Sequence, residues 1–174
     1  DAFPESALMR PCPMQALDLA DDIEFDLVIL PYQVWYLAPS IPVMSFLKSD
    51  QAKRLLKGKP VITVIACRNM WFKAQEKMQT LLSDIGAHLT DNIALTDPNS
   101  TLATLITTPR WLWFGKKTPF WGLPAAGLTE AQVRGTRRFG LALCTALRNG
   151  EEKTGKPMLQ GLQAVNANPH LLAS

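Results

Sequence analysis

The sequence predicts an α/β protein with a doubly wound parallel sheet and helices on both of its faces. Three short apolar segments at 26–30, 59–66 and 88–95 are the expected strands. Helical patterns lie between them, and this alternation favours parallel strands joined by right-handed crossovers. The 174 residues suffice for one domain with a sizeable core, so residues 1–174 are interpreted as a single domain.

Each expected strand has a recognisable boundary. Residues 1–22 are rich in Pro and Asp and predict an irregular lead-in. The run 26–30 ends at Pro31, and the run 59–66 follows a glycine. Both runs are apolar throughout rather than alternating, which is typical of strands covered on both faces. The third run, 88–95, has the weaker pattern.

The segments between the strands carry helical spacing and helix-end signals. Residues 41–56 repeat apolar side chains at helical intervals, and Ser49 is expected to divide them into two helices. A further helix is predicted over 70–85, with Asn69 as its N-cap and Gly86 just past its end.

The second half of the chain is less regular. Residues 107–128 hold three of the five Trp residues and are interpreted as a Trp-rich insertion, a compact excursion rather than an open loop. Thr129 and Gln132 form a capping box that opens a helix running to residue 149. Residues 151–174 are expected to form an extended C-terminal tail.

Composition and charge exclude several classes of protein. Apolar residues make up 47% of the chain, which argues against disorder, and no apolar run reaches the 18 residues of a membrane span. The net charge of +3 is too small to predict nucleic-acid binding. Residues 31–174 carry a balance of +9, which either favours an anionic ligand or is an ordinary solvated surface. The three Cys and two His residues show no metal-ligand spacing, and sparse cysteines suggest a cytoplasmic protein.

Two loops follow the first two expected strands and meet at one edge of the sheet, where doubly wound folds bind ligands. The loop 31–42 offers aromatic side chains between prolines, and the loop 66–71 offers backbone amides and the guanidinium of Arg68. Together they suit a flat aromatic ring with polar edges.

These segments also resemble a known family. The run 25–48 is similar to the third strand, aromatic flavin loop and following helix of flavodoxin-like proteins. Within that superfamily the chain most resembles the dialkylresorcinol condensing enzymes. The stretches that carry this resemblance are Phe3-Pro4-Glu5-Ser6, Tyr32-Gln33-x-Trp35, Gly58-Lys59-Pro60-Val61-Ile62-Thr63-Val64-Ile65-x-Cys67-Arg68-Asn69-Met70-Trp71, Ala74-Gln75-Glu76-Lys77, Asp91-Asn92-Ile93 and Arg138-Phe139-Gly140.

The resemblance implies a site for flavin mononucleotide (FMN). Carried over by position, the cofactor-binding residues would be Gln33, Trp35, Tyr36, Cys67, Arg68, Asn69 and Met70. The family's first strand and phosphate loop have no counterpart before residue 26, so the sheet is expected to lack its first strands. The first strand of this chain would then be an open edge, and the chain alone is expected to bind flavin weakly.

Each of these residues has a structural alternative. The two aromatic residues of the first loop could anchor it by burial, and Cys67 could be a small buried hydrophobe. Arg68 could pair with an acid, and Asn69 could act only as a helix cap. Trp111, Trp113 and Trp121 could roof a substrate pocket, form a dimer contact or touch a membrane surface.

Three functions follow from this interpretation. The first is an FMN-dependent oxidoreductase that aromatises a small cyclic dione to a dialkylresorcinol. The second is an electron-transfer or NAD(P)H-quinone reductase module. The third is a non-catalytic binding protein with the flavodoxin fold. A homodimer is compatible with each, and no catalytic side chain is singled out by the sequence.

Overall fold

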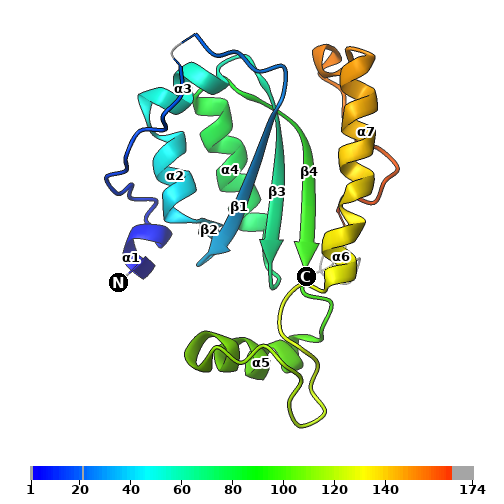
Figure 1. Cartoon of the computed structure of the whole chain (residues 1–174). Coiled ribbons are helices and arrows are strands. Elements are labelled where there is room, and N and C mark those ends of the chain that lie inside the picture. Colours follow the sequence, from blue (N-terminus) through cyan, green and yellow to red (C-terminus); the bar gives the residue numbers. More distant parts are fainter. Residues whose placement is uncertain (1, 21, 166–174) are drawn as a thin grey trace.

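Three parallel strands make up most of an open four-stranded sheet (Figure 1). The computed structural model describes residues 2–20 and 22–165. The strands are β1 (Val28–Trp35), β2 (Ala38–Pro39), β3 (Pro60–Cys67) and β4 (His88–Thr96), in the spatial order β2-β1-β3-β4. β2 alone is antiparallel, paired with the end of β1. The expected α/β class and the parallel arrangement of the three predicted strands are confirmed.

Helices cover the sheet from both sides. They are α1 (Ala2–Ala7), α2 (Ile41–Leu47), α3 (Asp50–Leu56), α4 (Phe72–Asp84), α5 (Thr101–Phe114), α6 (Glu130–Gly135) and α7 (Arg137–Arg148), with the 3-10 helix η1 (Glu151–Thr154). Consecutive residues of β3 face opposite layers. Val61 and Ile65 pack with the core of α2, α3 and α4, whereas Ile62 packs with Phe139 and Leu143 of α7.

β1 differs from the prediction in length and in burial. The strand continues past Pro31 to Trp35. The backbone carbonyl of Gln33 accepts a hydrogen bond from the Ser40 amide on the outer side of β1. Backbone groups two residues apart in a strand point the same way, so the nitrogen of Pro31 also faces this outer edge. A missing N–H there costs the sheet no hydrogen bond. Leu30 is buried but Ile29 is 52% exposed. The prediction that both faces are covered is therefore wrong for this strand, because α7 lies over β3 and β4.

The outer edge of β1 is closed only at its carboxyl end. There β2 pairs Pro39 with Val34 and Ala38 with Trp35. In the part of the chain that the structure describes, residues 28–32 pair with no strand on that side. The edge expected from the sequence is thus partly covered by a hairpin.

Most helix boundaries follow the predicted signals. Ser49 ends the first helical segment and caps α3 by accepting a hydrogen bond from the Ala52 amide at 3.2 Å. The Thr129–Gln132 capping box is present, and Gly86 follows α4 with φ +75°. The helix predicted from Thr129 to residue 149 is divided at Thr136 into α6 and α7.

The start of α4 corrects the prediction at Asn69. The helix begins at Phe72, with Trp71 at the N-cap position. Asn69 instead accepts a hydrogen bond from the neighbouring Met70 amide at 2.8 Å. Met70 has φ +55°, and this left-handed conformation prevents the helix from extending back to Asn69.

Both ends of the described chain are tied to the body. The lead-in predicted as irregular contains α1, whose buried Ser6 donates a hydrogen bond to the Trp35 carbonyl at 2.7 Å. In the predicted tail, Leu159 is buried and the Ala164 carbonyl accepts from the Ala94 amide at 2.9 Å, so the segment runs beside β4. Residues 166–174 of that tail lie outside the described residues.

Candidate functional site

A cavity of about 360 Å³ lies at the carboxyl edge of the parallel strands, between the sheet and α5. Its volume is within the range of small-molecule sites, and its position is where doubly wound sheets bind ligands. The residues that line it are Gln33, Val34, Trp35, Ala66, Cys67, Arg68, Asp97, Thr108, Trp111, Lys117, Gly127 and Leu128.

Five residues singled out from the sequence meet in this cavity. Gln33 and Trp35 come from the end of β1, Cys67 ends β3, Arg68 follows it, and Trp111 comes from α5. Gln33 also accepts a hydrogen bond from the indole Nε1 of Trp35 at 3.2 Å, which orients that ring. Two predicted loops and the Trp-rich segment therefore converge, although they lie far apart in the sequence.

The other predicted residues lie elsewhere. Tyr36 packs edge-on against Phe3, with ring centroids 4.9 Å apart. Asn69 bonds locally, Met70 is mostly exposed, and neither lines the cavity. Trp113 and Trp121 are 79% and 90% exposed and also lie outside the lining.

The loop predicted over residues 31–42 is a tight hairpin. Tyr36 and Leu37 connect β1 to β2, with φ +51° and +60°. Two central residues with positive φ match the twist of a type I′ turn, a conformation that glycine or asparagine usually provides. Left-handed backbone at non-glycine residues is strained, and strain of this kind clusters at binding sites. At this sheet edge Tyr36, Leu37 and Met70 all adopt it.

Asp97 is the residue that sequence analysis missed. It is buried directly after β4, and its carboxylate accepts from the Asn99 amide at 2.9 Å and from the Gly127 amide at 2.7 Å. Its own amide donates to the Cys67 carbonyl at 3.1 Å. Asp97 thereby joins both ends of the 98–127 excursion to the end of β3. The available signal was its place immediately after a predicted strand, in the turn sequence Asp-Pro-Asn-Ser.

Two cations give the cavity a positive side. Lys117 Nζ lies 5.3 Å from the ring centroid of Trp111, a cation–π arrangement. Arg68 is half-buried, and among residues 2–20 and 22–165 no hydrogen bond or ion pair engages its guanidinium. Asp97, the acid beside them, already accepts two backbone amides. The arrangement leaves Arg68 available to an anionic or electron-rich ligand.

Cys67 is poorly suited to act as a nucleophile. Burial raises the pKa of its thiol to about 11, so the protonated form dominates at neutral pH. Burial likewise raises the pKa of the nearby Tyr32 hydroxyl, and a Cys67 thiolate would add to that effect. The Tyr32 hydroxyl donates to Gln75 Oε1 at 2.7 Å, and Gln75 Nε2 donates to Thr63 Oγ1 at 3.1 Å. These groups form a buried hydrogen-bond network between the sheet and α4.

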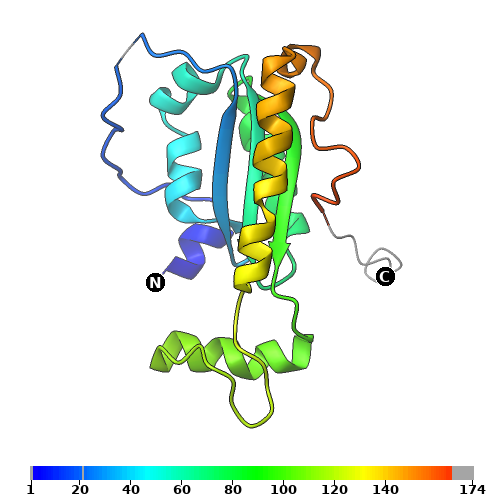
Figure 2. The same ribbon diagram turned by 45° about the vertical axis from the view of Figure 1, so that its right-hand side comes forward.

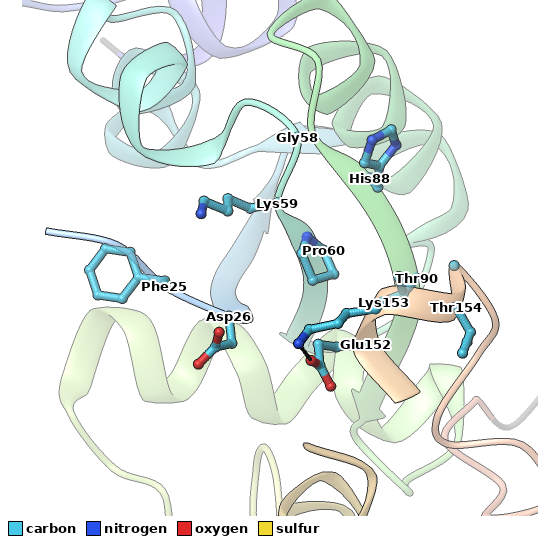
Figure 3. Close-up of a pocket in the computed structure, with 11 residues that line it drawn as sticks. Phe25, Asp26, Gly58, Lys59, Pro60, His88, Thr90, Glu152, Lys153 and Thr154 are labelled. Atoms are coloured by element: carbon cyan, nitrogen blue, oxygen red, sulfur yellow. Dashed lines mark ion pairs between the residues drawn. The ribbon is translucent and has the colours of Figure 1, made fainter. Parts of the chain in front are cut away.

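A second cavity, of about 510 Å³, lies at the opposite edge of the sheet (Figure 3). It is formed by the amino ends of β3 and β4 together with η1, and contains none of the predicted cofactor residues. Glu152 is buried there, with Lys153 Nζ 3.9 Å from one of its oxygens. The other oxygen has no hydrogen-bond partner among the described residues.

The carboxyl-edge cavity is the better candidate because it combines aromatic faces, an available guanidinium and strained backbone at the ligand-binding edge of the fold. Within the described ranges, no group of three or more His, Cys, Asp or Glu side chains is arranged to hold a metal ion. Comparison with protein-family models, curated proteins and solved structures found no match to this chain.

Proposed function

We propose that the carboxyl-edge cavity binds the isoalloxazine ring of FMN and that the protein is a flavin-dependent oxidoreductase. The observation that carries the proposal is the convergence of Trp35 and Trp111 with Arg68 and Lys117 around one cavity. Flat apolar faces with a few convergent polar groups are what a planar heteroaromatic ring requires.

The residues present fit the ring portion of this cofactor. Trp35 and Trp111 would contact its faces, and Arg68 would donate hydrogen bonds to the pyrimidine edge. A cation at that edge favours the reduced, anionic form of a flavin. When bound, the flavin would accept a hydride from the substrate. Cys67 would contribute shape rather than nucleophilic chemistry, since its thiol stays protonated.

The substrate class follows from the resemblance to dialkylresorcinol condensing enzymes and from the apolar surroundings of the cavity. A small cyclic dione would lose two hydrogens to give an aromatic resorcinol ring, with the flavin as the oxidant. Leu128 and Trp111 supply apolar surface for such a substrate.

The test begins with binding. The chain is titrated with FMN and with riboflavin, following flavin fluorescence. We expect quenching that weakens roughly tenfold in Arg68→Gln and in Trp111→Leu, and remains unchanged in the exposed control Trp113→Leu. Similar affinity for riboflavin and FMN would show that the ring carries the binding. Failure of the chain to bind either flavin at millimolar concentration contradicts the proposal.

Activity is tested separately. A flavin-loaded protein that oxidises a 1,3-cyclohexanedione in the presence of an electron acceptor has the proposed activity. Fast reduction by a nicotinamide cofactor with no dione turnover would instead identify an electron-transfer module.

A further inference from the structure

Helix α5 carries its apolar side chains on the face that meets solvent. Leu102, Leu105, Ile106, Leu112 and Trp113 are spaced at intervals of three, four and seven residues and so share one face. Each is at least half exposed, and Leu102 and Leu112 reach 77% and 74%. An exposed stripe of this size is unusual on a soluble domain and marks an interaction surface.

The opposite face of α5 is small and polar, yet it is the buried one. Ala103, Thr104 and Thr107 are buried. The buried hydroxyl of Thr107 finds a hydrogen-bond partner within the helix by donating to the Ala103 carbonyl at 3.0 Å. A helix that follows the usual rule would bury its leucines and expose its threonines. This inversion indicates that the outer face is adapted to an apolar environment outside the chain.

The segment after α5 extends the same surface. Phe120 and Trp121 stack with their ring centroids 5.2 Å apart, and a turn closed by Phe120 and Leu123 presents Trp121 to solvent. Figures 1 and 2 both show α5 and this loop projecting beyond the carboxyl ends of the strands, away from the other helices. We call Leu102, Leu105, Ile106, Leu112, Trp113, Phe114 and Trp121 the α5 surface.

The chain segment that forms the α5 surface carries only positive charges. No Asp or Glu occurs between Asp97 and Glu130, whereas Arg110, Lys116 and Lys117 lie within that interval. Arg110 braces the loop by donating to the Lys116 carbonyl at 3.2 Å and to the Thr118 carbonyl at 2.7 Å. Its charge is therefore held in place, and among residues 2–20 and 22–165 no acid pairs with it.

We infer that the α5 surface docks on an anionic phospholipid bilayer, lying in the interface between headgroups and acyl chains. Trp, Phe and Leu on one face with Lys and Arg beside them is the composition of interfacial helices. Anionic headgroups complement the positive charges of Arg110 and Lys116. No helix in the described parts of the chain has the length and apolar character needed to cross a membrane, so the mode is surface attachment.

A second copy of the chain is a poorer occupant of this surface. A symmetric dimer through the α5 surface would place the same patch against itself. It would bring the cations of both copies together with no acid between Asp97 and Glu130 to pair with them. An anionic lipid surface suits the α5 surface better, since it supplies an apolar layer for the exposed side chains and negative charge for the cations.

Vesicle flotation tests the inference, which does not depend on flavin binding. The full chain is mixed with vesicles of phosphatidylglycerol and phosphatidylcholine, and separately with phosphatidylcholine alone. We expect flotation with the anionic vesicles, a blue shift of Trp emission, and loss of both at high salt. Leu112→Ser combined with Trp113→Ser should reduce vesicle affinity roughly tenfold or more.

The control is Leu141→Ser, which removes an exposed leucine from α7 and should leave flotation unchanged. Far-ultraviolet circular dichroism checks that each variant keeps the fold. Absence of flotation by the unmodified chain would overturn the inference. So would a dimer seen by sedimentation velocity that the Leu112/Trp113 variant abolishes while vesicle binding is absent, because a second copy would then be the occupant.

Discussion

The carboxylate of Asp97 accepts the backbone amide of Gly127 at 2.7 Å, across thirty positions of sequence. This bond closes the excursion that contains α5, and a second bond to Asn99 fixes the carboxylate from the other side. Because Asp97 itself follows β4, the excursion is anchored at the carboxyl edge of the sheet. Both the candidate site, through Trp111, and the α5 surface depend on this anchor.

Asp97→Ala should release the excursion while leaving the sheet folded. The substitution removes two hydrogen bonds to a buried carboxylate, which together stabilise the closed excursion by about 2 kcal/mol or more. Amide hydrogen exchange should accelerate across 101–127 and stay unchanged in β3. Asp97→Asn, which keeps one acceptor oxygen, should show a smaller effect. Equal acceleration in β3 would mean that Asp97 supports the whole fold instead.

Tyr32→Phe should destabilise the protein by about 1–2 kcal/mol, because it leaves the buried oxygen of Gln75 without its donor. Urea unfolding followed by fluorescence measures the change. Tyr36→Phe is the matched control, since the Tyr36 side chain is exposed and should change the free energy of unfolding by less than about 0.5 kcal/mol. An equal effect of the two substitutions would argue against the buried network.

Cys67 should be the slowest of the three cysteines to react with iodoacetamide. Its pKa of about 11 leaves little thiolate at pH 8, whereas Cys12 and Cys144 are exposed. Peptide mass spectrometry after timed alkylation distinguishes the sites. Fast labelling of Cys67 at pH 8 would contradict the protonated thiol.

The same shift predicts a pH dependence of stability. The thiol ionises near its ordinary value of 9.0 in the unfolded chain but only near 11 in the folded one. The contribution of the protonated thiol to the free energy of unfolding is therefore intact below pH 9 and is lost progressively as the pH rises toward about 11. Comparing Cys67→Ala with the unmodified chain, by urea unfolding at pH 8 and pH 10.5, isolates this effect. Between pH 8 and pH 10.5 the unmodified chain should lose more free energy of unfolding than Cys67→Ala does.

Two glycines should respond in opposite directions to alanine. Gly86 has φ +75°, which costs an L-residue about 1 kcal/mol or more, so Gly86→Ala should lower stability by that amount. Gly140 lies inside α7 with open space where an alanine methyl group would project, so Gly140→Ala should raise stability by about 0.5–1 kcal/mol. Thermal unfolding of the two variants gives the sign of each stability change. If both variants were stabilised, or both destabilised, the backbone argument would be wrong for one of them.

Local signals in the sequence located much of the secondary structure. The apolar runs 59–66 and 88–95 predicted β3 and β4 within one residue at each end. For β3 the reason is that a buried strand needs little beyond its own apolar content. Ser49 and the Thr129–Gln132 box marked helix starts, since a cap acts within three residues. The same locality explains the error at Asn69, where a cap residue was present but the backbone turned at Met70.

Position on the sheet was harder to predict than element type. Proline usually ends a strand, and the sequence predicts that the first strand ends at Pro31. β1 continues through it because the nitrogen of Pro31 faces the outer edge of the strand. The tail likewise gave no local signal of its place. Asp91 accepts the Met158 amide at 2.7 Å across 67 positions, a contact that no short-range pattern encodes.

Local patterns along the chain are enough to predict the alternation of strands and helices. They also predict that Gln33, Trp35, Cys67 and Arg68 lie at one sheet edge, because parallel strands end on the same side. Which tryptophan joins these residues depends on the folded arrangement. Trp111 and Trp113 are two positions apart and so lie on opposite faces of α5, one in the cavity and one in solvent. Helical periodicity separates two faces but does not say which one meets the sheet. That is decided by how the excursion, closed by the bond from Asp97 to Gly127, packs at the carboxyl edge.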